Sequence, residues 1–289
     1  MKSYRLKFSI LVFFCAFFAK EAYPQSNTDD ISNHPFFVNY WVTGTICGVG
    51  VVANYLGITE VLGKKEISAS ELQALNKNVF NGIDSWALNL DPSHVNTYEN
   101  YSTYTVAVSC ALPGLLLFDK QIKRDWSDML LMYMETMTIT TNIFEWSPLG
   151  PTFQNKFRPI TYYAQLPDNQ RNSGSYRNSL YSGHVAAVTA ATFFMAKVYS
   201  DYNPGIGSNK YLLYGAALAP PLFLSYLRVA GLKHFPSDVA VGMGVGALVG
   251  IIVPELHRQQ GRGVSFGLFS SPEGSGIAMA WHPDFLQQN

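Results

Sequence analysis

The sequence predicts an all-α protein, a bundle of six helices, and three observations support this fold class. Apolar residues make up 48% of the 289 residues and charged residues only 14%, whereas about 25% charged residues is usual in soluble domains. Six apolar segments of helical length follow one another along the chain. Short polar clusters interrupt this helical pattern. The composition therefore indicates helices buried in a bilayer or in a tightly packed bundle.

Residues 1–25 have the order of a secretory signal peptide. Lys2, Arg5 and Lys7 precede an apolar run at residues 8–19, and small and polar residues follow. The run is short for a membrane span, but it has the usual length of the apolar part of a signal. We therefore predict an exported protein, with an uncleaved anchor as the alternative.

The predicted helices form one domain, residues 35–258. They are expected at residues 36–58, 103–118, 129–144, 185–198, 211–232 and 239–253. Pro220 and Pro221 should kink the fifth of them. Gly242, Gly246 and Gly250 recur every fourth residue in the sixth, a spacing that lets another helix approach closely.

Two further elements are expected outside the six segments. In the polar stretch between the first and second segments, Ser68 and Glu71 have the spacing of a capping box, which predicts a short helix at residues 68–74. The last part of the chain, residues 259–289, is a tail in which residues 264–269 and 276–281 are typical of a β-hairpin.

Six membrane spans are the preferred interpretation of the apolar segments, and an exported soluble bundle is the alternative. The mean hydropathy is only +0.05, and the segments are on average shorter than the roughly 20 residues of a span. A cleaved signal would place the loop after the third segment inside the cell. Lys120, Lys123 and Arg124 lie between the second and third segments, and the positive-inside rule favours the opposite orientation.

Three polar clusters at helix boundaries are candidates for chemistry. They are Asn-Lys-Phe-Arg-Pro at residues 155–159, Ser-Gly-His at residues 182–184, and Arg228 with His234 and Asp238. Each cluster alone is typical of an ordinary helix end. Their combination suits a phosphate group.

Four residues of these clusters could hold a phosphate. Arg158 and Arg228 can each clamp two phosphate oxygens with a planar guanidinium group. Ser182 and Gly183 begin a helix, where backbone N–H groups and the helix dipole favour an anion. Gly183 has no Cβ atom, so an oxyanion could come close to its backbone.

Three residues could carry out hydrolysis. A neutral imidazole of His234 can attack phosphorus, and the Asp238 carboxylate, one turn further on, is placed to fix its tautomer. Pro236 is expected to begin the sixth helix. His184 would then protonate the leaving oxygen as the general acid.

The three clusters together resemble the type 2 phosphatidic acid phosphatase family, which shares its helical core with bacterial acid phosphatases and vanadium haloperoxidases. That family has Lys, six residues, then Arg-Pro; Pro-Ser-Gly-His; and Ser-Arg, five residues, His, three residues, Asp. The chain matches at Arg158-Pro159, Ser182-Gly183-His184, Arg228, His234 and Asp238. The resemblance extends over roughly residues 125–257. It implies the bundle of that family, His234 as nucleophile, His184 as acid, and a phosphate cradle of Arg158, Arg228, Ser182 and Gly183.

The chain departs from the family pattern at three positions. Pro151 stands where the family has its lysine, Tyr181 replaces the proline before Ser182, and Leu227 replaces the serine before Arg228. Lys156 could supply the missing charge from another direction, or it could be an ordinary loop lysine.

The resemblance implies a metal-independent phosphohydrolase that uses no cofactor and acts on a phosphomonoester or a diphosphate. The preferred substrate is a lipid phosphate, and the preferred location is the inner membrane of a bacterial cell envelope with the site facing the periplasm. A soluble exported acid phosphatase and a catalytically weakened envelope homologue are the alternatives, and a haloperoxidase is a more distant one. Lys and Arg total 20, as do Asp and Glu, so the charge balance gives no indication of a nucleic-acid partner.

Overall fold

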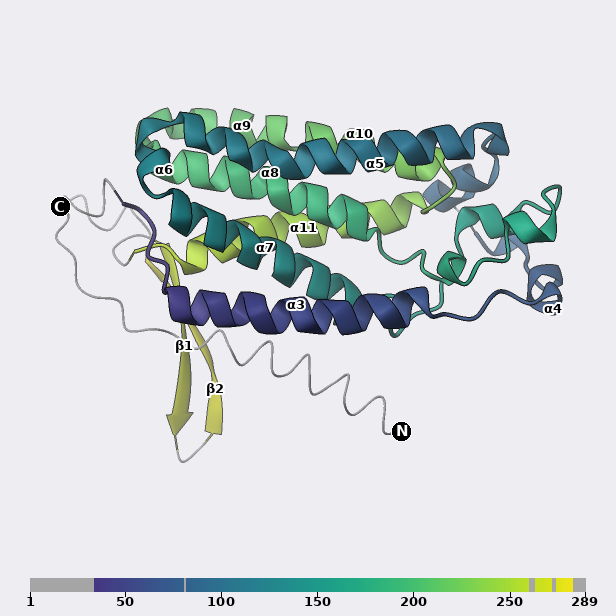
Figure 1. The fold of residues 1–289 in the computed structure, drawn as a ribbon, viewed down its shortest axis with the longest axis horizontal. Helices are drawn as coiled ribbons and strands as arrows, with labels where there is room; N and C mark the ends of the chain where they lie inside the picture. Colours follow the sequence, from purple (N-terminus) through teal and green to yellow (C-terminus); the bar gives the residue numbers. More distant parts are fainter. Residues whose placement is uncertain (1–33, 81, 260–262, 272–273, 283–289) are drawn as a thin grey trace.

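Long helices that lie side by side make up most of the chain (Figure 1). The computed structural model describes residues 34–80, 82–259, 263–271 and 274–282, and the predicted signal peptide lies outside them. The long helices are α3 (Tyr40–Leu62), α5 (Val95–Ala111), α7 (Trp126–Trp146), α8 (Gly183–Tyr202), α9 (Lys210–Ala217), α10 (Ala219–Ala230) and α11 (Pro236–Leu256). Two short helices, α4 (Ala69–Gln73) and α6 (Lys120–Arg124), and several 3₁₀ turns lie between them.

Each of the six predicted segments contains helix, although the first begins at Tyr40 and not at Phe36, so the all-helical class of the bundle is confirmed. The count of six needs correction. Among the described residues there are nine α-helices, because α4 and α6 are additional and the fifth segment is divided. The division lies between Ala217 and Ala219, immediately before Pro220 and Pro221. Proline has no N–H to donate, so it is tolerated in the first turn of a helix and starts α10 rather than continuing α9.

The short helix α4 is held by the predicted capping box. The Ser68 hydroxyl accepts from the Glu71 amide at 3.3 Å, and the Glu71 carboxylate accepts from the Ser68 amide at 2.9 Å. The Glu71 carboxylate also contacts the Arg177 guanidinium at 2.7 Å, so the cap ties the loop after α3 to the loop before α8.

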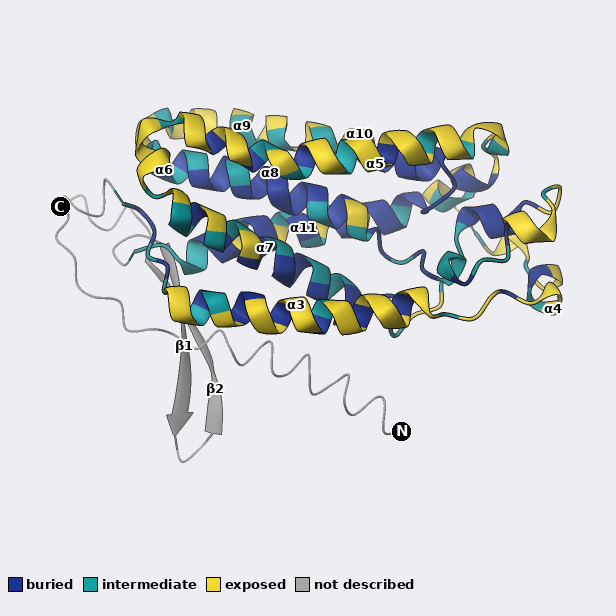
Figure 2. Ribbon diagram, in the orientation of Figure 1, coloured by how far each residue is buried: buried dark blue, intermediate teal, exposed yellow. Residues whose placement is uncertain are grey.

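Helix α8 is the centre of the bundle. It packs against α5, α7, α9, α10 and α11, and most of its residues are buried (Figure 2). The predicted glycine seam on α11 faces it: a Cβ atom at Gly242 would lie 2.6 Å from the Ser182 carbonyl oxygen, and one at Gly250 would lie 2.6 Å from that of Ala190. The two backbones therefore lie in contact, and the first turns of α8 and α11 are held together.

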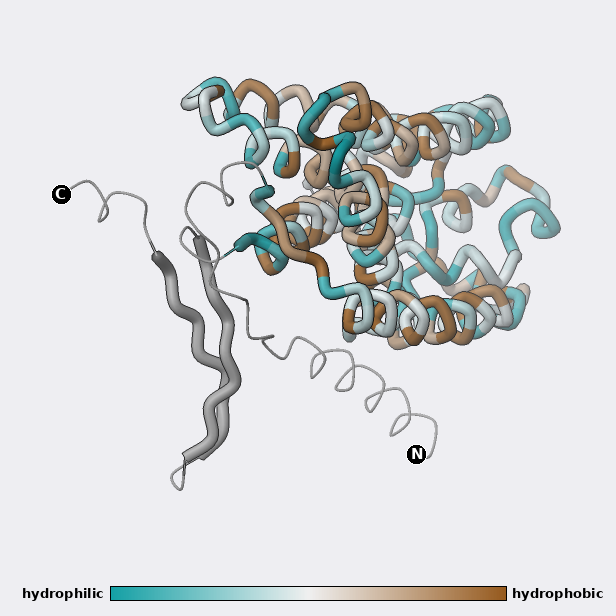
Figure 3. Tube along the Cα trace, turned by 60° about the vertical axis from the view of Figure 1, so that its left-hand side comes forward, coloured by the Kyte–Doolittle hydropathy of each residue, from teal (hydrophilic) through white to brown (hydrophobic). Residues whose placement is uncertain are grey.

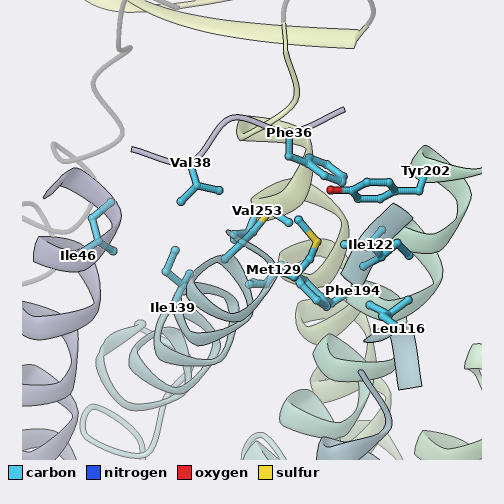
Figure 4. Close-up of a cluster of buried hydrophobic side chains, with 13 residues drawn as sticks. Phe36, Val38, Ile46, Leu116, Ile122, Met129, Ile139, Phe194, Tyr202 and Val253 are labelled. Carbon is cyan, nitrogen blue, oxygen red and sulfur yellow. The ribbon is translucent and has the colours of Figure 1, made fainter. Parts of the chain in front are cut away.

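A cluster of buried apolar side chains closes the end of the bundle where α3 begins (Figure 4). It joins the residues before α3 to the last turn of α8, since the rings of Phe36 and Tyr202 lie 5.8 Å apart. Glu135 of α7 pairs with His257 at the end of α11, at 2.6 Å, so this buried carboxylate belongs to the same end of the molecule.

Four helical stretches are long and apolar enough to cross a membrane, which fits a membrane protein: residues 40–62, 92–118, 204–230 and 236–256. They expose large apolar side chains such as Trp41, which is 87% exposed, and hydrophobic residues recur along α3 (Figure 3). The third and fourth predicted spans, now α7 and α8, are not among the four. Their polar residues, such as Thr140 and Thr189, are buried inside the bundle.

Two strands follow the helices. The strands β1 (Gly263–Ser271) and β2 (Gly274–His282) pair antiparallel, with Gly263 opposite His282.

Candidate active site

The predicted site residues meet at the end of the bundle where α8 and α11 begin and α10 ends (Figure 1). The Ser182 amide donates to the Asp238 carbonyl oxygen at 3.2 Å, which joins the starts of α8 and α11. The loop that carries Arg158 is joined to the turn before α11, because the Ile160 amide donates to the Leu232 carbonyl oxygen at 3.3 Å. All three polar clusters of the sequence therefore contribute to one site.

The turn between α10 and α11 fixes the spacing of Arg228 and His234. The amides of Lys233 and His234 both donate to the Arg228 carbonyl oxygen, at 3.0 and 3.3 Å. Leu232 has a φ of 55°, in the left-handed region, which costs a non-glycine residue about 1–3 kcal/mol. Its side chain is fully buried against Ile160, so packing holds the turn in this conformation.

His234 is held by a backbone carbonyl rather than by Asp238. Its Nδ1 lies 2.7 Å from the Ser179 carbonyl oxygen, and its Nε2 lies 3.4 Å from the Arg228 guanidinium. A carbonyl can only accept a hydrogen bond, so Nδ1 carries the proton and Nε2 carries the lone pair. Burial, and then the charges of Arg228 and Arg158, lower the pKa of His234 well below its ordinary value. The buried imidazole is therefore neutral, with its lone pair on the side of Arg228.

Asp238 corrects the predicted geometry, because its carboxylate is occupied elsewhere. One oxygen accepts from the Lys156 ammonium at 2.7 Å, and the other accepts from the Ser179 hydroxyl at 2.6 Å and from the Phe235 amide at 2.9 Å. The last of these bonds caps the first turn of α11, and it turns the side chain back toward the start of its own helix. Asp238 thus reaches His234 only through Ser179.

Lys156 has contacts with carboxylates. Its ammonium lies 2.7 Å from Asp238 and 3.7 Å from Asp84, and it stands over the Phe235 ring at 4.7 Å. Asp84 belongs to the 3₁₀ turn η2 (Gly82–Leu88) and also accepts from the Ser237 hydroxyl at 2.6 Å. In the structure Lys156 is therefore a counter-ion to Asp238 and Asp84.

The two arginines suit an anion. Arg228 is only 4% exposed, and its Nε has no hydrogen-bond partner among the described residues. A buried donor without an acceptor costs about 1–3 kcal/mol, so an oxyanion at this position would relieve an existing penalty. Arg158 is partly buried, its Nε donates to the Asn178 carbonyl oxygen at 3.4 Å, and its guanidinium lies 6.0 Å from the centre of the Tyr176 ring.

Gly183 was expected at the start of α8 because an oxyanion could approach its backbone, but the structure gives a second reason for a glycine there. The Ser182 hydroxyl caps the helix by accepting from the Val185 amide at 3.5 Å. A Cβ atom at Gly183 would lie 3.1 Å from three carbons of the Phe144 ring, so close packing against this ring already favours a glycine. The first-turn amides of Gly183 and His184 have no carbonyl partner within the helix. They remain suitable donors to an anion.

His184 lies at the same helix start and reaches solvent. The protein atoms that crowd its ring, and then the charges of Arg228, Arg158 and Lys233, lower its pKa. Because part of the residue is exposed, we attribute more of this effect to the three positive charges than to burial. His184 is therefore neutral in the empty site at neutral pH.

Sequence reasoning missed two residues of this site, Lys233 and Ser179. Lys233 is buried, and its ammonium contacts the Glu99 carboxylate of α5 at 2.8 Å. Its position directly before His234, in an otherwise apolar turn, could have indicated from the sequence that Lys233 lies at the site. No pattern in the sequence indicates that the Ser179 carbonyl and hydroxyl would join His234 to Asp238. Among the described residues, no three His, Cys, Asp or Glu side chains come together as a group that could hold a metal ion.

Comparison with known proteins gives one result that agrees with this geometry. Residues 128–262 match the model of the PAP2 superfamily. The searches of curated proteins and of solved structures found no match. The matched segment contains Arg158, His184, Arg228, His234 and Asp238, and members of this superfamily are phosphatases. The match over residues 128–262 supports a type 2 phosphatidic acid phosphatase-like family.

Proposed function

We propose that this protein is a phosphatase that removes phosphate from a lipid phosphomonoester or diphosphate by way of a phosphohistidine on His234. The observation that carries the proposal is the orientation of His234. Its Nδ1 proton is fixed by the Ser179 carbonyl at 2.7 Å, and its Nε2 lone pair lies beside the buried Arg228 guanidinium. A neutral nucleophile beside a guanidinium whose Nε has no acceptor among the described residues suits attack on a phosphate.

The reaction has two steps. In the first, Nε2 of His234 forms a bond to phosphorus, the bond from phosphorus to the leaving oxygen breaks, and His184 gives that oxygen a proton. In the second, His184 takes a proton from a water molecule, the water oxygen bonds to phosphorus, and the bond from phosphorus to Nε2 breaks. Arg158, Arg228 and the first-turn amides of α8 hold the non-bridging oxygens throughout, and no metal ion is needed.

His184 must gain a proton before it can act as an acid. Burial, and then the charges of Arg228, Arg158 and Lys233, lower its pKa. A bound phosphate dianion offsets these charges and raises that pKa again. Substrate binding therefore prepares the acid, and a substrate that arrives as a monoanion can bring the proton with it.

The outer surface supports a lipid substrate. Large apolar side chains cover α3, α5 and α10, and the site lies at one end of the bundle, where the head group of a lipid in the bilayer would be (Figures 1 and 3). This exposed apolar surface favours a membrane enzyme over the soluble acid phosphatase.

The orientation proposed for the enzyme places the site in the periplasm of a bacterial cell envelope. The basic helix α6, with Lys120, Lys123 and Arg124, packs against the other end of α8 from the site (Figure 1). The positive-inside rule assigns that end to the cytoplasm.

Phosphate release from a panel of lipid and soluble phosphates by the detergent-solubilised protein tests the proposal. We expect release from lipid phosphates and none from His234→Ala, whereas His94→Ala, which changes an exposed histidine in a short turn before α5, should keep wild-type activity. Near-normal turnover by a folded His234→Ala protein would overturn the assigned nucleophile. Preference for soluble esters would favour the exported acid phosphatase. A folded wild-type protein without activity on the whole panel would favour the catalytically weakened homologue.

A further inference from the structure

A buried lysine adjoins the two arginines of the site. Lys233 is 6% exposed, and lysine is almost never buried this far without a partner. Glu99 is the hydrogen-bond partner of its ammonium among the described residues, at 2.8 Å. An ammonium has three N–H donors. Two of the three are therefore available for another acceptor.

Three positive charges meet in this region. The Lys233 ammonium and the Arg158 guanidinium approach the same ring, that of Tyr176, at 5.7 and 6.0 Å from its centre. Burial lowers the pKa of Lys233, the bond to Glu99 opposes this, and the charges of Arg158 and Arg228 lower it further. The three cations are therefore close enough to repel one another.

Among the described residues, Glu99 is the carboxylate that forms an ion pair with one of these three cations. Glu99 faces Lys233, while Asp238 and Asp84 are taken up by Lys156. Arg158, Arg228 and Lys233 therefore carry more positive charge than the paired Glu99 offsets, which suits an anion such as phosphate. The Glu99 side chain is 46% exposed, so it can turn toward solvent at little cost.

We propose that Lys233 is the third cation of the phosphate site, and that Glu99 is its counter-ion in the empty site and gives way when phosphate binds. The proposal rests on the phosphatase function given above and adds to it a binding residue and a competing group. It also explains how the site tolerates Pro151 in place of the family lysine: the charge comes from the turn before His234, not from Lys156.

Binding of orthovanadate and of inorganic phosphate to the solubilised, full-length protein tests this proposal. Titration calorimetry measures the affinity of every variant, including those without activity. Lys233→Met keeps an apolar chain of similar length and should weaken binding of both anions about tenfold or more. Lys65→Met removes an exposed lysine from the same end of the bundle and is the matched control, with no expected change.

The variant Glu99→Gln distinguishes a Glu99 that competes with phosphate for Lys233 from a Glu99 that helps phosphate to bind. If Glu99 competes with phosphate for Lys233, Glu99→Gln should strengthen anion binding in the wild-type background and leave it unchanged in the Lys233→Met background. The double variant contains neither charge, so it also controls for a buried ion that has lost its partner. Weaker binding by Glu99→Gln would overturn the role of Glu99.

Anion binding tests the role of Lys233, and phosphate release tests the proposed phosphatase function, so the two can fail separately. Wild-type affinity in a folded Lys233→Met protein would remove Lys233 from the site while leaving the phosphatase proposal in place. No binding of either anion by the active wild-type protein would also overturn the inference. A wild-type protein that binds both anions but releases no phosphate from any substrate would contradict the proposed function alone.

Discussion

Asp238 accepts a hydrogen bond from the Ser179 hydroxyl at 2.6 Å, and the carbonyl of the same serine lies 2.7 Å from Nδ1 of His234. One residue thus transmits the effect of the carboxylate to the imidazole. We propose that Asp238 orients His234 by holding the backbone at Ser179, while it also caps α11 through the Phe235 amide. Loss of either link should change the orientation of the nucleophile without removing it.

Ser179→Ala tests this link. The carbonyl of residue 179 remains, but it loses the bond that fixes its position, and Asp238 loses one of its donors. A hydrogen bond to a charged group contributes about 1.5–3 kcal/mol, so we expect kcat to fall about 10- to 100-fold with a smaller change in KM. Steady-state phosphate release measures the effect. Ser208→Ala, at an exposed serine, is the control, and an unchanged kcat in Ser179→Ala would contradict the indirect role of Asp238.

The role of His184 depends on the leaving group. His184→Ala should lower kcat about 10²–10⁴-fold on alkyl phosphates, the usual contribution of general acid catalysis. With a nitrophenyl phosphate, whose leaving oxygen needs no proton, the same variant should show a far smaller fall in kcat. Parallel kinetics on the two substrates give the comparison. Equal losses on both would show that His184 supports binding or structure instead.

Anion binding should be accompanied by proton uptake. The charges around His184 lower its pKa in the empty site, and a bound dianion raises it, so the complex holds more protons than the free protein near neutral pH. Binding should therefore strengthen as the pH falls toward the ordinary pKa of histidine. Calorimetry with sulfate, which does not titrate in this range, in two buffers of different ionisation enthalpy measures the uptake. His184→Ala should abolish it and His94→Ala should not; uptake that survives in His184→Ala would assign the proton to another group.

Gly183 should be a packing requirement. Gly183→Ala places a methyl group 3.1 Å from the Phe144 ring, and overpacking of this kind costs about 1–3 kcal/mol. We expect a lower Tm together with lower activity. Phe144→Leu in the same protein should restore much of both, because it removes the facing ring. Failure of this second change to restore either would instead support the close approach of an oxyanion to the glycine.

The orientation of the site can be measured by labelling single cysteines in intact cells. Cysteine at the exposed Ser70, in α4 at the site end, should react with an impermeant reagent, and cysteine at the exposed Gln121, in α6, should not. The three native cysteines, Cys15, Cys47 and Cys110, are replaced beforehand. The reverse pattern would place the site in the cytoplasm, as the prediction of a cleaved signal requires.

The helices were predictable because each depends mainly on the residues of its own segment. Apolar runs of helical length fixed all six segments, Pro220 and Pro221 marked the division of the fifth, and the glycines of α11 indicated the seam that lies against α8. Six spans were preferred, whereas four of the described helical stretches are long and apolar enough to cross a membrane. A helix enclosed by other helices and a helix in lipid both need apolar residues. Only the packing of α7 and α8 distinguishes the two environments.

The site was predictable as a set of residues but not as a network of contacts. The sequence spacing brought His234 and Asp238 close, yet His234 precedes α11 while Asp238 lies within its first turn, so the carboxylate serves the helix start. Lys156 pairs with Asp238 and Asp84, and we propose that Lys233 is the lysine of the phosphate site. Which lysine faces the arginines depends on how the loop with Arg158 meets the turn before α11, and that is a tertiary contact.

The position of the phosphoryl group in the trapped intermediate tests the central claim most directly. Alkaline quenching of the enzyme during turnover preserves phosphohistidine, and fragmentation mass spectrometry together with phosphorus NMR identifies both the residue and the ring nitrogen. Because Nδ1 of His234 is bonded to the Ser179 carbonyl and Nε2 faces Arg228, the account predicts phosphate on Nε2 of His234. Phosphate on Nδ1, or on any residue other than His234, would contradict it.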